Sequence, residues 1–325
     1  MFFQEHLSRI AARAAAGIVA VAALASCGGG TYQVTAFVPA RILSFGDESS
    51  KLVGAQGLKY SINGLSTATN LVDCTINPLW VQVLANSYSL VYANCNVEAV
   101  ATPGAVDLST LQATVGDLVD QVNAFQSGDT FNGNDLVTIW AGEYDVINGY
   151  KANGSGDQAT LLGDMQAAGA TLADAVNAIA ATGAKVILLT MPDMGMSPFA
   201  YAEQQRGDFD RQKLLSDMSG AFNLGLRSNI LNDGSKIGLV LVDDYTRNAI
   251  RSPGSFSLIS LPNQSYACLD SAPLPTCNQE TINVDPSTGV QPTASFLWAD
   301  PTHLAPTAHN YIGNQAVGRA HSNPF

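Results

Sequence analysis

The sequence has little charge and no long hydrophobic run in most of its length. Only 13% of its 325 residues are charged, about half the usual share of roughly 25%. Basic residues are the scarcer kind: 15 Lys and Arg stand against 27 Asp and Glu, for a net charge of −12. Without a basic cluster, a surface for the phosphate backbone is not expected, so nucleic acid is excluded as a partner. No apolar run of about 18 residues follows the N-terminal segment, so none predicts a membrane-spanning helix.

Histidine and the common catalytic motifs are also scarce. Of four histidines, His6 lies near the N-terminus, which leaves His303, His309 and His321 within the last 23 residues. The chain has no Gly-x-Ser-x-Gly, His-Glu-x-x-His, P-loop or Gly-x-Gly-x-x-Gly motif. These absences argue against the common α/β-hydrolase, zincin, nucleotide-hydrolase and dinucleotide-binding classes. We therefore expect neither a metal nor a cofactor.

The first 26 residues are typical of an export signal. Arg9 and Arg13 precede a 12-residue apolar stretch, Ala14 to Ala25, which is too short to span a bilayer. The stretch ends in Leu24-Ala25-Ser26-Cys27, which resembles the lipobox of bacterial lipoproteins; an ordinary signal with a chance Cys is the alternative. The sequence predicts a signal over residues 1–26, a lipid on Cys27 that anchors the protein in the bacterial envelope, and a tether over residues 27–40.

The cysteines fit this exported destination. Beyond Cys27 the chain has Cys74, Cys95, Cys268 and Cys277, an even number that suggests two disulfides in an oxidising compartment. Four cysteines allow three pairings, of which the local pairs Cys74–Cys95 and Cys268–Cys277 are favoured. Their spacing matches no zinc site.

Short apolar runs alternate with helical periods over residues 41–325. Strands are predicted over residues 41–45, 136–140, 185–190 and 237–242, and helices over residues 108–125, 161–179 and 214–230. Strands that are apolar on both faces and separated by amphipathic helices indicate one α/β domain with a parallel sheet covered on both sides. Residues 252–296 are rich in Pro, Ser and Asn and predict a long loop. Sites in such sheets lie at the carboxyl ends of the strands.

One histidine has a partner at a useful spacing. In Asp300-Pro301-Thr302-His303, an aspartate three residues before the histidine can reach the imidazole and fix its tautomer. The other ring nitrogen would then be free to accept a proton from a hydroxyl. His309 is expected to pack on the helix that follows, and His321 to lie in the terminal tail.

Several short blocks follow one another in a characteristic order: Phe45-Gly46-Asp47, Gly104-Ala105, Gly142-Glu143-Tyr144-Asp145, Pro192-Asp193-Met194-Gly195 and Asp300-Pro301-Thr302-His303. With these blocks the chain resembles the SGNH, or GDSL, family of ester hydrolases over about residues 41–320, and it is most similar to the long lipase and esterase branch, which includes autotransporter esterases. The resemblance implies a flavodoxin-like three-layer α/β/α sandwich.

The resemblance also implies roles for single residues. His303 is the implied general base, Asp300 its orienting partner, and Gly104 a backbone donor to the oxyanion. Two positions depart from the family pattern: Glu48 follows Gly-Asp where the family has its nucleophilic Ser, and Tyr144 replaces an oxyanion-binding Asn.

The nucleophile therefore has two candidates. The family often has eight steps between this Phe and a following Gly, whereas Phe45 to Gly54 is nine. One inserted residue, Glu48, would make Ser49 the nucleophile and an oxyanion donor. Alternatively, Glu48 fills the nucleophile position itself.

From these residues we expect a monomeric, envelope-anchored serine hydrolase of small-molecule or lipid esters, in which Ser49, Asp300 and His303 are catalytic. The Ser49 and Gly104 N–H groups and the Tyr144 hydroxyl would bind the oxyanion. The alternative is a weak or inactive lipoprotein that binds acylated lipid or glycan. Metal-dependent hydrolysis through Asp47, Glu48 and Asp300 is less well supported, because no histidine cluster accompanies them.

Overall fold

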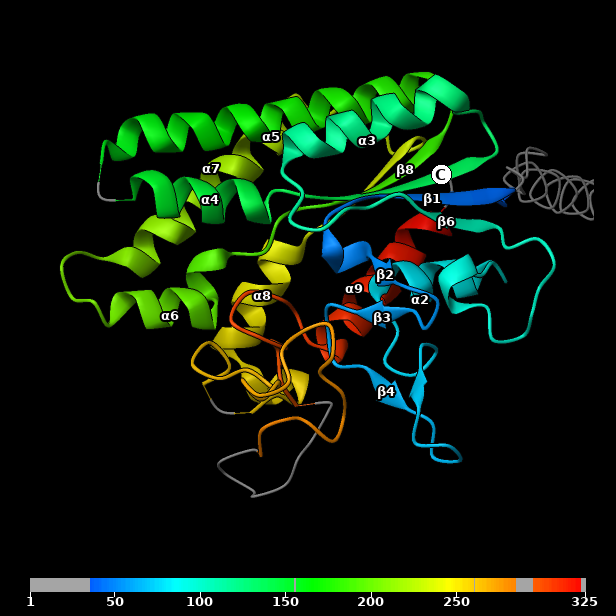
Figure 1. Cartoon of the computed structure of the whole chain (residues 1–325). Helices are drawn as coiled ribbons and strands as arrows, with labels where there is room; N and C mark the ends of the chain where they lie inside the picture. Colours follow the sequence, from blue (N-terminus) through cyan, green and yellow to red (C-terminus); the bar gives the residue numbers. More distant parts are fainter. Residues whose placement is uncertain (1–35, 155, 260, 285–294, 323–325) are drawn as a thin grey trace, which may run out of the picture. The chain divides into compact units, whose positions relative to one another are not determined.

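The computed structural model describes residues 36–154, 156–259, 261–284 and 295–322. Cys27 and the predicted signal lie outside these residues. The described part contains a five-stranded sheet in the order β6-β1-β7-β8-β9, in which every neighbouring pair is parallel (Figure 1). Numbered along the sheet, this is the 2-1-3-4-5 order of flavodoxin-like folds. The strands are β1 (Arg41–Gly46), β6 (Ala105–Asp107), β7 (Asp135–Trp140), β8 (Lys185–Leu189) and β9 (Ile237–Val240).

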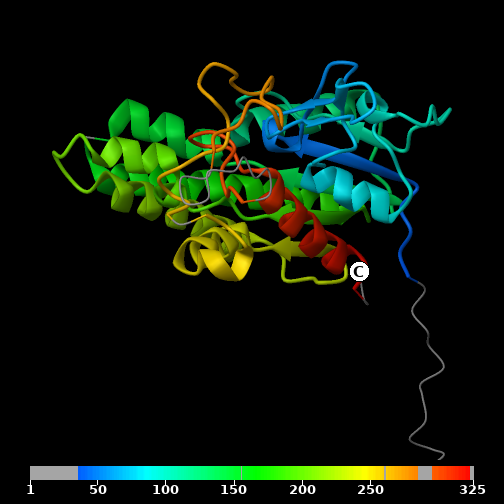
Figure 2. The ribbon, with the colours of Figure 1, turned by 90° about the horizontal axis from the view of Figure 1, so that it is seen from below.

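Helices cover both faces of this sheet, and alternate strand residues point to different cores. Leu43 and Phe45 of β1 pack into one core with helices α3, α5 and α7, whereas Ile42 packs into another with α2 and α9. Figure 1 shows α3 and α5 on one side of the strands, and Figure 2, seen from below, shows α9 and α8 on the other. The helices are α2 (Trp80–Ser87), α3 (Val115–Gly128), α4 (Glu143–Asn153), α5 (Gln158–Ala181), α6 (Pro198–Gln204), α7 (Arg211–Asn229), α8 (Val242–Arg251) and α9 (Pro306–Ala320).

The predicted three-layer α/β/α fold is confirmed, and so are its four strands. The helices predicted over residues 161–179 and 214–230 correspond to α5 and α7. The helix predicted over residues 108–125 corresponds to α3, which begins later than predicted, at Val115. The Thr114 side chain accepts a hydrogen bond from the Asp117 N–H and so caps the helix there. Leu108 and Leu111 precede this helix, in the loop that leads from β6 to the site described below.

Small elements and two disulfides complete the described chain. Cys74–Cys95 and Cys268–Cys277 are both formed, as predicted. None of the helices in the described ranges has the length and apolarity needed to cross a bilayer. The short strands are β2 (Leu52–Val53), β3 (Leu58–Lys59), β4 (Gly64–Leu65) and β5 (Val72–Asp73), and the 3-10 turns are η1 (Glu48–Ser50), η2 (Ala93–Cys95), η3 (Met194–Met196) and η4 (Pro253–Phe256).

Candidate active site

The site begins where β1 ends. Gly46 has a φ of 130°, and a Cβ there would lie 1.9 Å from the Trp140 carbonyl oxygen of β7, so only glycine fits. The chain turns directly into η1, where the Asp47 carboxylate accepts a hydrogen bond of 2.9 Å from the Ser49 N–H. This turn delivers the Glu48 side chain to the carboxyl end of the sheet.

Glu48 is almost fully buried and has three polar partners. The Gln112 N–H donates to Oε2 at 2.6 Å, and the Tyr144 hydroxyl donates to Oε1. His303 Nε2 lies 3.3 Å from the same Oε1. Glu48 is 1% exposed, so this carboxylate exchanges its water shell for protein donors.

Asp300 fixes the orientation of His303. One carboxylate oxygen lies 2.8 Å from His303 Nδ1, and the other accepts the backbone N–H groups of Thr302 at 2.8 Å and His303 at 2.7 Å. The Tyr60 ring lies beside the imidazole, with 5.6 Å between centroids. The predicted Asp300–His303 pair is therefore formed, and its outer nitrogen faces a carboxylate.

These contacts make the resting site an ion triad. Burial opposes charge on His303, but the Asp300 charge and hydrogen bonds to Asp300 and Glu48 raise its pKa well above 6.5. Burial likewise opposes charge on Glu48, yet hydrogen bonds from His303 and Tyr144 leave its pKa below 4.5. A protonated imidazole thus lies between two ionised carboxylates.

Two further buried acids surround the triad. Burial raises the pKa of Asp47 to about 7, and the charge of Glu48 adds to the rise. Burial also raises the pKa of Glu143 well above 4.5, and its Oε1 has no hydrogen-bond partner among the described residues. Burial therefore favours the neutral form of Glu143. The described residues include no group of His, Cys, Asp or Glu that could hold a metal ion.

Most of the predicted site residues lie together in the structure. Glu48, Tyr144, Asp300 and His303 meet at one point. Ser49 lies in the same turn, but in the described structure its hydroxyl makes no hydrogen bond to His303. The geometry thus places Glu48 opposite the imidazole, and a nucleophilic role for Ser49 remains a prediction.

Gly104 requires a correction. It precedes β6 and accepts a 2.9 Å hydrogen bond from the Ile42 N–H, at the amino end of this parallel sheet. The site lies at the carboxyl end, so Gly104 is not positioned to bind an oxyanion. The backbone N–H of Gln112 does reach the site, where it donates to Glu48 Oε2, and Gln112 has a left-handed conformation with a φ of 56° that glycine usually adopts.

The other described histidines are not part of the triad. His309 is buried on α9 next to Trp140, with ring centroids 6.2 Å apart. Burial, together with the charges of Lys59 and His303, lowers its pKa to about 3, so it is neutral at pH 7. His321 stacks on Tyr88 at 4.5 Å.

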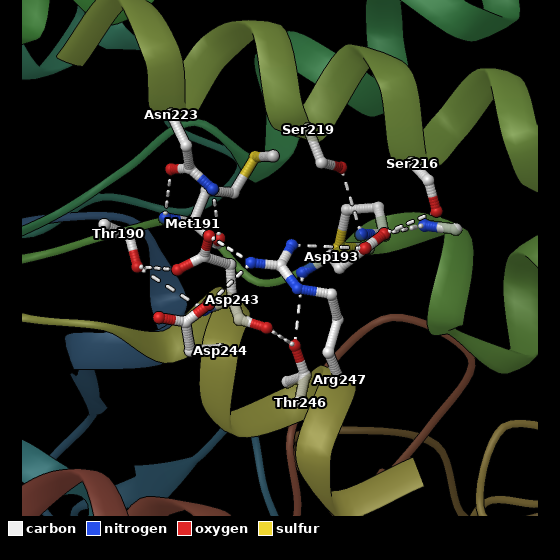
Figure 3. Close-up of polar contacts among 12 residues, drawn as sticks. Thr190, Met191, Asp193, Ser216, Ser219, Asn223, Asp243, Asp244, Thr246 and Arg247 are labelled. Atoms are coloured by element: carbon white, nitrogen blue, oxygen red, sulfur yellow. Dashed lines mark hydrogen bonds and ion pairs between the residues drawn. The ribbon is translucent and has the colours of Figure 1, made fainter. Parts of the chain in front are cut away.

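A second polar cluster lies beyond the triad, at the carboxyl ends of β8 and β9 (Figure 3). Asp243 accepts hydrogen bonds from Thr190 at 2.8 Å and Arg247 at 2.8 Å. Asp193 accepts a bond of 2.7 Å from Ser216 and lies 3.5 Å from Arg247. Since these carboxylates have protein partners, the cluster ties the loop after β8 to α7 and α8.

The chain is similar in sequence to known proteins. The model of the GDSL-like lipase/acylhydrolase family matches residues 42–316. A phosphatidylcholine-sterol acyltransferase of Aeromonas hydrophila is 28% identical over 201 residues, which cover 58% of this chain and 54% of the relative. The chain thus matches about half the length of that relative.

Proteins of known structure are similar to this chain as well. A phospholipase A1 from Streptomyces albidoflavus has 13% identity and a TM-score of 0.42, with 87% of this chain and 100% of that chain covered. An extracellular lipase from Streptomyces rimosus has 13% identity and a TM-score of 0.45, with 87% and 99% covered.

Proposed function

Because the chain belongs to the GDSL-like lipase/acylhydrolase family, we propose that it binds acyl esters at the Glu48–His303 site and hydrolyses them only weakly. The observation that carries this proposal is the 3.3 Å approach of the Glu48 carboxylate to His303 Nε2. A serine hydrolase needs a hydroxyl and a neutral imidazole at this point. Here a carboxylate faces an imidazole whose pKa is raised.

Glu48 cannot simply replace the serine in ester hydrolysis. An attack by a carboxylate on an ester carbonyl gives an adduct with two possible leaving groups. The carboxylate is a far weaker base than an alkoxide, so it leaves first and the adduct reverts to the starting ester. The proposed site thus combines the Asp300–His303 pair with a poor nucleophile for esters.

A second candidate is hydrolysis through Ser49. Two observations favour it: Ser49 lies one residue further along the same turn, and the Asp300–His303 pair is intact. In this mechanism the Glu48 side chain would have to leave the histidine so that the Ser49 hydroxyl could replace it.

Fluorophosphonate labelling distinguishes the two candidates. Residues 28–325 would be treated with a fluorophosphonate and assayed with p-nitrophenyl butyrate, next to Ser49→Ala and His303→Ala. We expect no labelled serine in the wild type and no loss of its residual hydrolysis in Ser49→Ala. A labelled Ser49 peptide, together with loss of hydrolysis in both variants, would overturn the proposal in favour of the second candidate.

We further propose that the protein is exported and anchored by a lipid on Cys27. The two disulfides of the folded domain support an oxidising compartment. Cys27→Ser should move the protein from the detergent phase to the aqueous phase, or leave an unprocessed precursor. Unchanged partitioning and an unchanged mass would contradict the anchor.

A further inference from the structure

Glu48, His303 and Asp300 lie in a row like the members of a catalytic triad, with a carboxylate in the position of the nucleophile. Glu48 faces His303 at 3.3 Å, and His303 faces Asp300 at 2.8 Å. We propose that Glu48 is a covalent nucleophile toward a saturated carbon that bears an oxygen leaving group, and that an epoxide is the substrate class. This inference goes beyond the proposed function, because it requires no ester hydrolysis of the substrate.

The leaving-group argument that weakens Glu48 against esters does not apply at a saturated carbon. Displacement there passes through no tetrahedral adduct that can expel the carboxylate, so the product is a stable alkyl ester of Glu48. A low pKa keeps the carboxylate ionised and available. Tyr144, which donates to Glu48, and Tyr60, whose ring lies beside His303, are only half-buried, so the triad lies close below the surface.

Two proton donors at Oε1 select an oxygen leaving group. The Tyr144 hydroxyl and the protonated Nε2 of His303 both point at this oxygen of Glu48. A substrate oxygen that entered between them could accept a hydrogen bond from Tyr144, whose pKa is raised by burial and nearby carboxylates, and the proton of His303. An epoxide suits this arrangement, because ring strain drives carbon–oxygen cleavage and the protonated oxygen stays attached to the substrate.

In the first step, Oε1 of Glu48 forms a bond to an epoxide carbon, and the electron pair of the broken carbon–oxygen bond goes to the ring oxygen. The Nε2 proton of His303 passes to that oxygen and makes it a hydroxyl. The site now holds a neutral ester of Glu48 and a neutral imidazole.

Water completes the second step. The neutral His303, held by Asp300, takes a proton from water as its oxygen attacks Cδ of the Glu48 ester. The negative charge that develops on the ester oxygens meets the Gln112 N–H, which lies 2.6 Å from Oε2 in the resting site, and the Tyr144 hydroxyl. Collapse breaks the ester bond, the carboxyl proton passes to the departing oxygen, and a diol leaves. The Glu48 carboxylate and protonated His303 are restored.

The loss of charge on Glu48 explains how one histidine can serve as acid and then as base. Glu48 is one of the carboxylates that raise the pKa of His303. Its esterification removes that charge for the lifetime of the intermediate and restores it on hydrolysis. The proton affinity of His303 therefore falls when a base is needed.

Glycidyl butyrate tests the inference and keeps it separate from the proposed function, since it carries an epoxide and an acyl ester in one molecule. Opening of the epoxide gives a diol monobutyrate, whereas ester hydrolysis gives butyrate and glycidol. We expect the diol from the wild type and its loss in Glu48→Gln. Wild-type protein quenched early in turnover should carry an adduct of one probe mass on the peptide that contains Glu48, and His303→Gln, which lacks the acid of the first step, should form this adduct more slowly. Circular dichroism would show whether both variants are folded.

A single turnover in ¹⁸O-water gives a readout that does not depend on any variant. With enzyme in excess, the proposed path puts the heavy oxygen into the Glu48 carboxyl group and leaves it out of the first diol. Heavy oxygen in that diol would overturn the covalent step. Absence of both the diol and the adduct would overturn the inference as a whole, while butyrate release alone would bear only on the ester activity.

Discussion

At the residue scale, Glu48 decides what this site can do. Glu48→Ser would place a hydroxyl opposite His303 and remove one of the two carboxylates that keep the imidazole protonated. It would also free the Gln112 N–H and the Tyr144 hydroxyl to bind an oxyanion. One such donor is worth about 10²–10³ in rate. We expect p-nitrophenyl butyrate hydrolysis to rise by at least about 10-fold over the wild type.

Glu48→Ala is the matched control, because it removes the carboxylate without adding a hydroxyl. The gain should appear in Glu48→Ser alone and should disappear when His303→Ala is added, since the pair acts as a unit. Equal activity in Glu48→Ser and Glu48→Ala would show that residue 48 does not occupy the nucleophile position.

Side chains with a sequence pattern could be predicted, and a backbone donor could not. Asp300 and His303 were identifiable from their spacing and were found in contact. The prediction for Gly104 came from its place in the family pattern, whereas the backbone N–H that reaches Glu48 belongs to Gln112. Every residue except proline has the same backbone N–H, so the residue type at position 112 did not indicate that its N–H reaches the site.

At the element scale, α5 and α7 pack closely against each other on one face of the sheet, and this packing depends on glycine. A Cβ at Gly169 of α5 would lie 2.0 Å from the Phe222 carbonyl oxygen of α7, whereas a Cβ at Gly163 would meet nothing within 4 Å. We expect Gly169→Ala to lower the free energy of unfolding by about 1–3 kcal/mol, as overpacking does. Gly163→Ala should raise it by about 0.5–1 kcal/mol through helix propensity. Urea denaturation measures both, and the same sign in both variants would contradict this packing.

Long, buried strands could be predicted from the sequence, and a short, partly exposed strand could not. The strands β7 and β8 are buried runs of five or six residues and were visible as apolar segments. β6 has only three residues, of which Val106 is exposed, so it carries no such pattern. β6 forms because it pairs with β1 at the edge of the sheet. Such pairing depends on distant residues and cannot be read from a three-residue segment.

At the scale of the whole molecule, the buried acids act on stability in opposite directions as pH changes. Glu48 and Asp300 have lowered pKa values, so their contribution is present above their ordinary pKa and is lost as pH falls. Asp47 and Glu143 have raised pKa values, as does His303. Their contribution is complete below the unfolded pKa of each group and is lost as pH rises through the folded value. Stability should therefore be greatest in mildly acidic solution.

Asp47→Asn isolates one part of this balance. Asn keeps an oxygen that can accept the Ser49 N–H but does not ionise. In the wild type, the pKa of Asp47 rises from 3.8 in the unfolded chain to about 7 on folding, so stability is lost as pH rises through this interval. The melting temperature of Asp47→Asn minus that of the wild type should thus increase from about pH 4 to about pH 8. Asp120→Asn, an exposed change on α3, should follow the wild type throughout. Parallel curves for all three proteins would show that folding does not raise the pKa of Asp47.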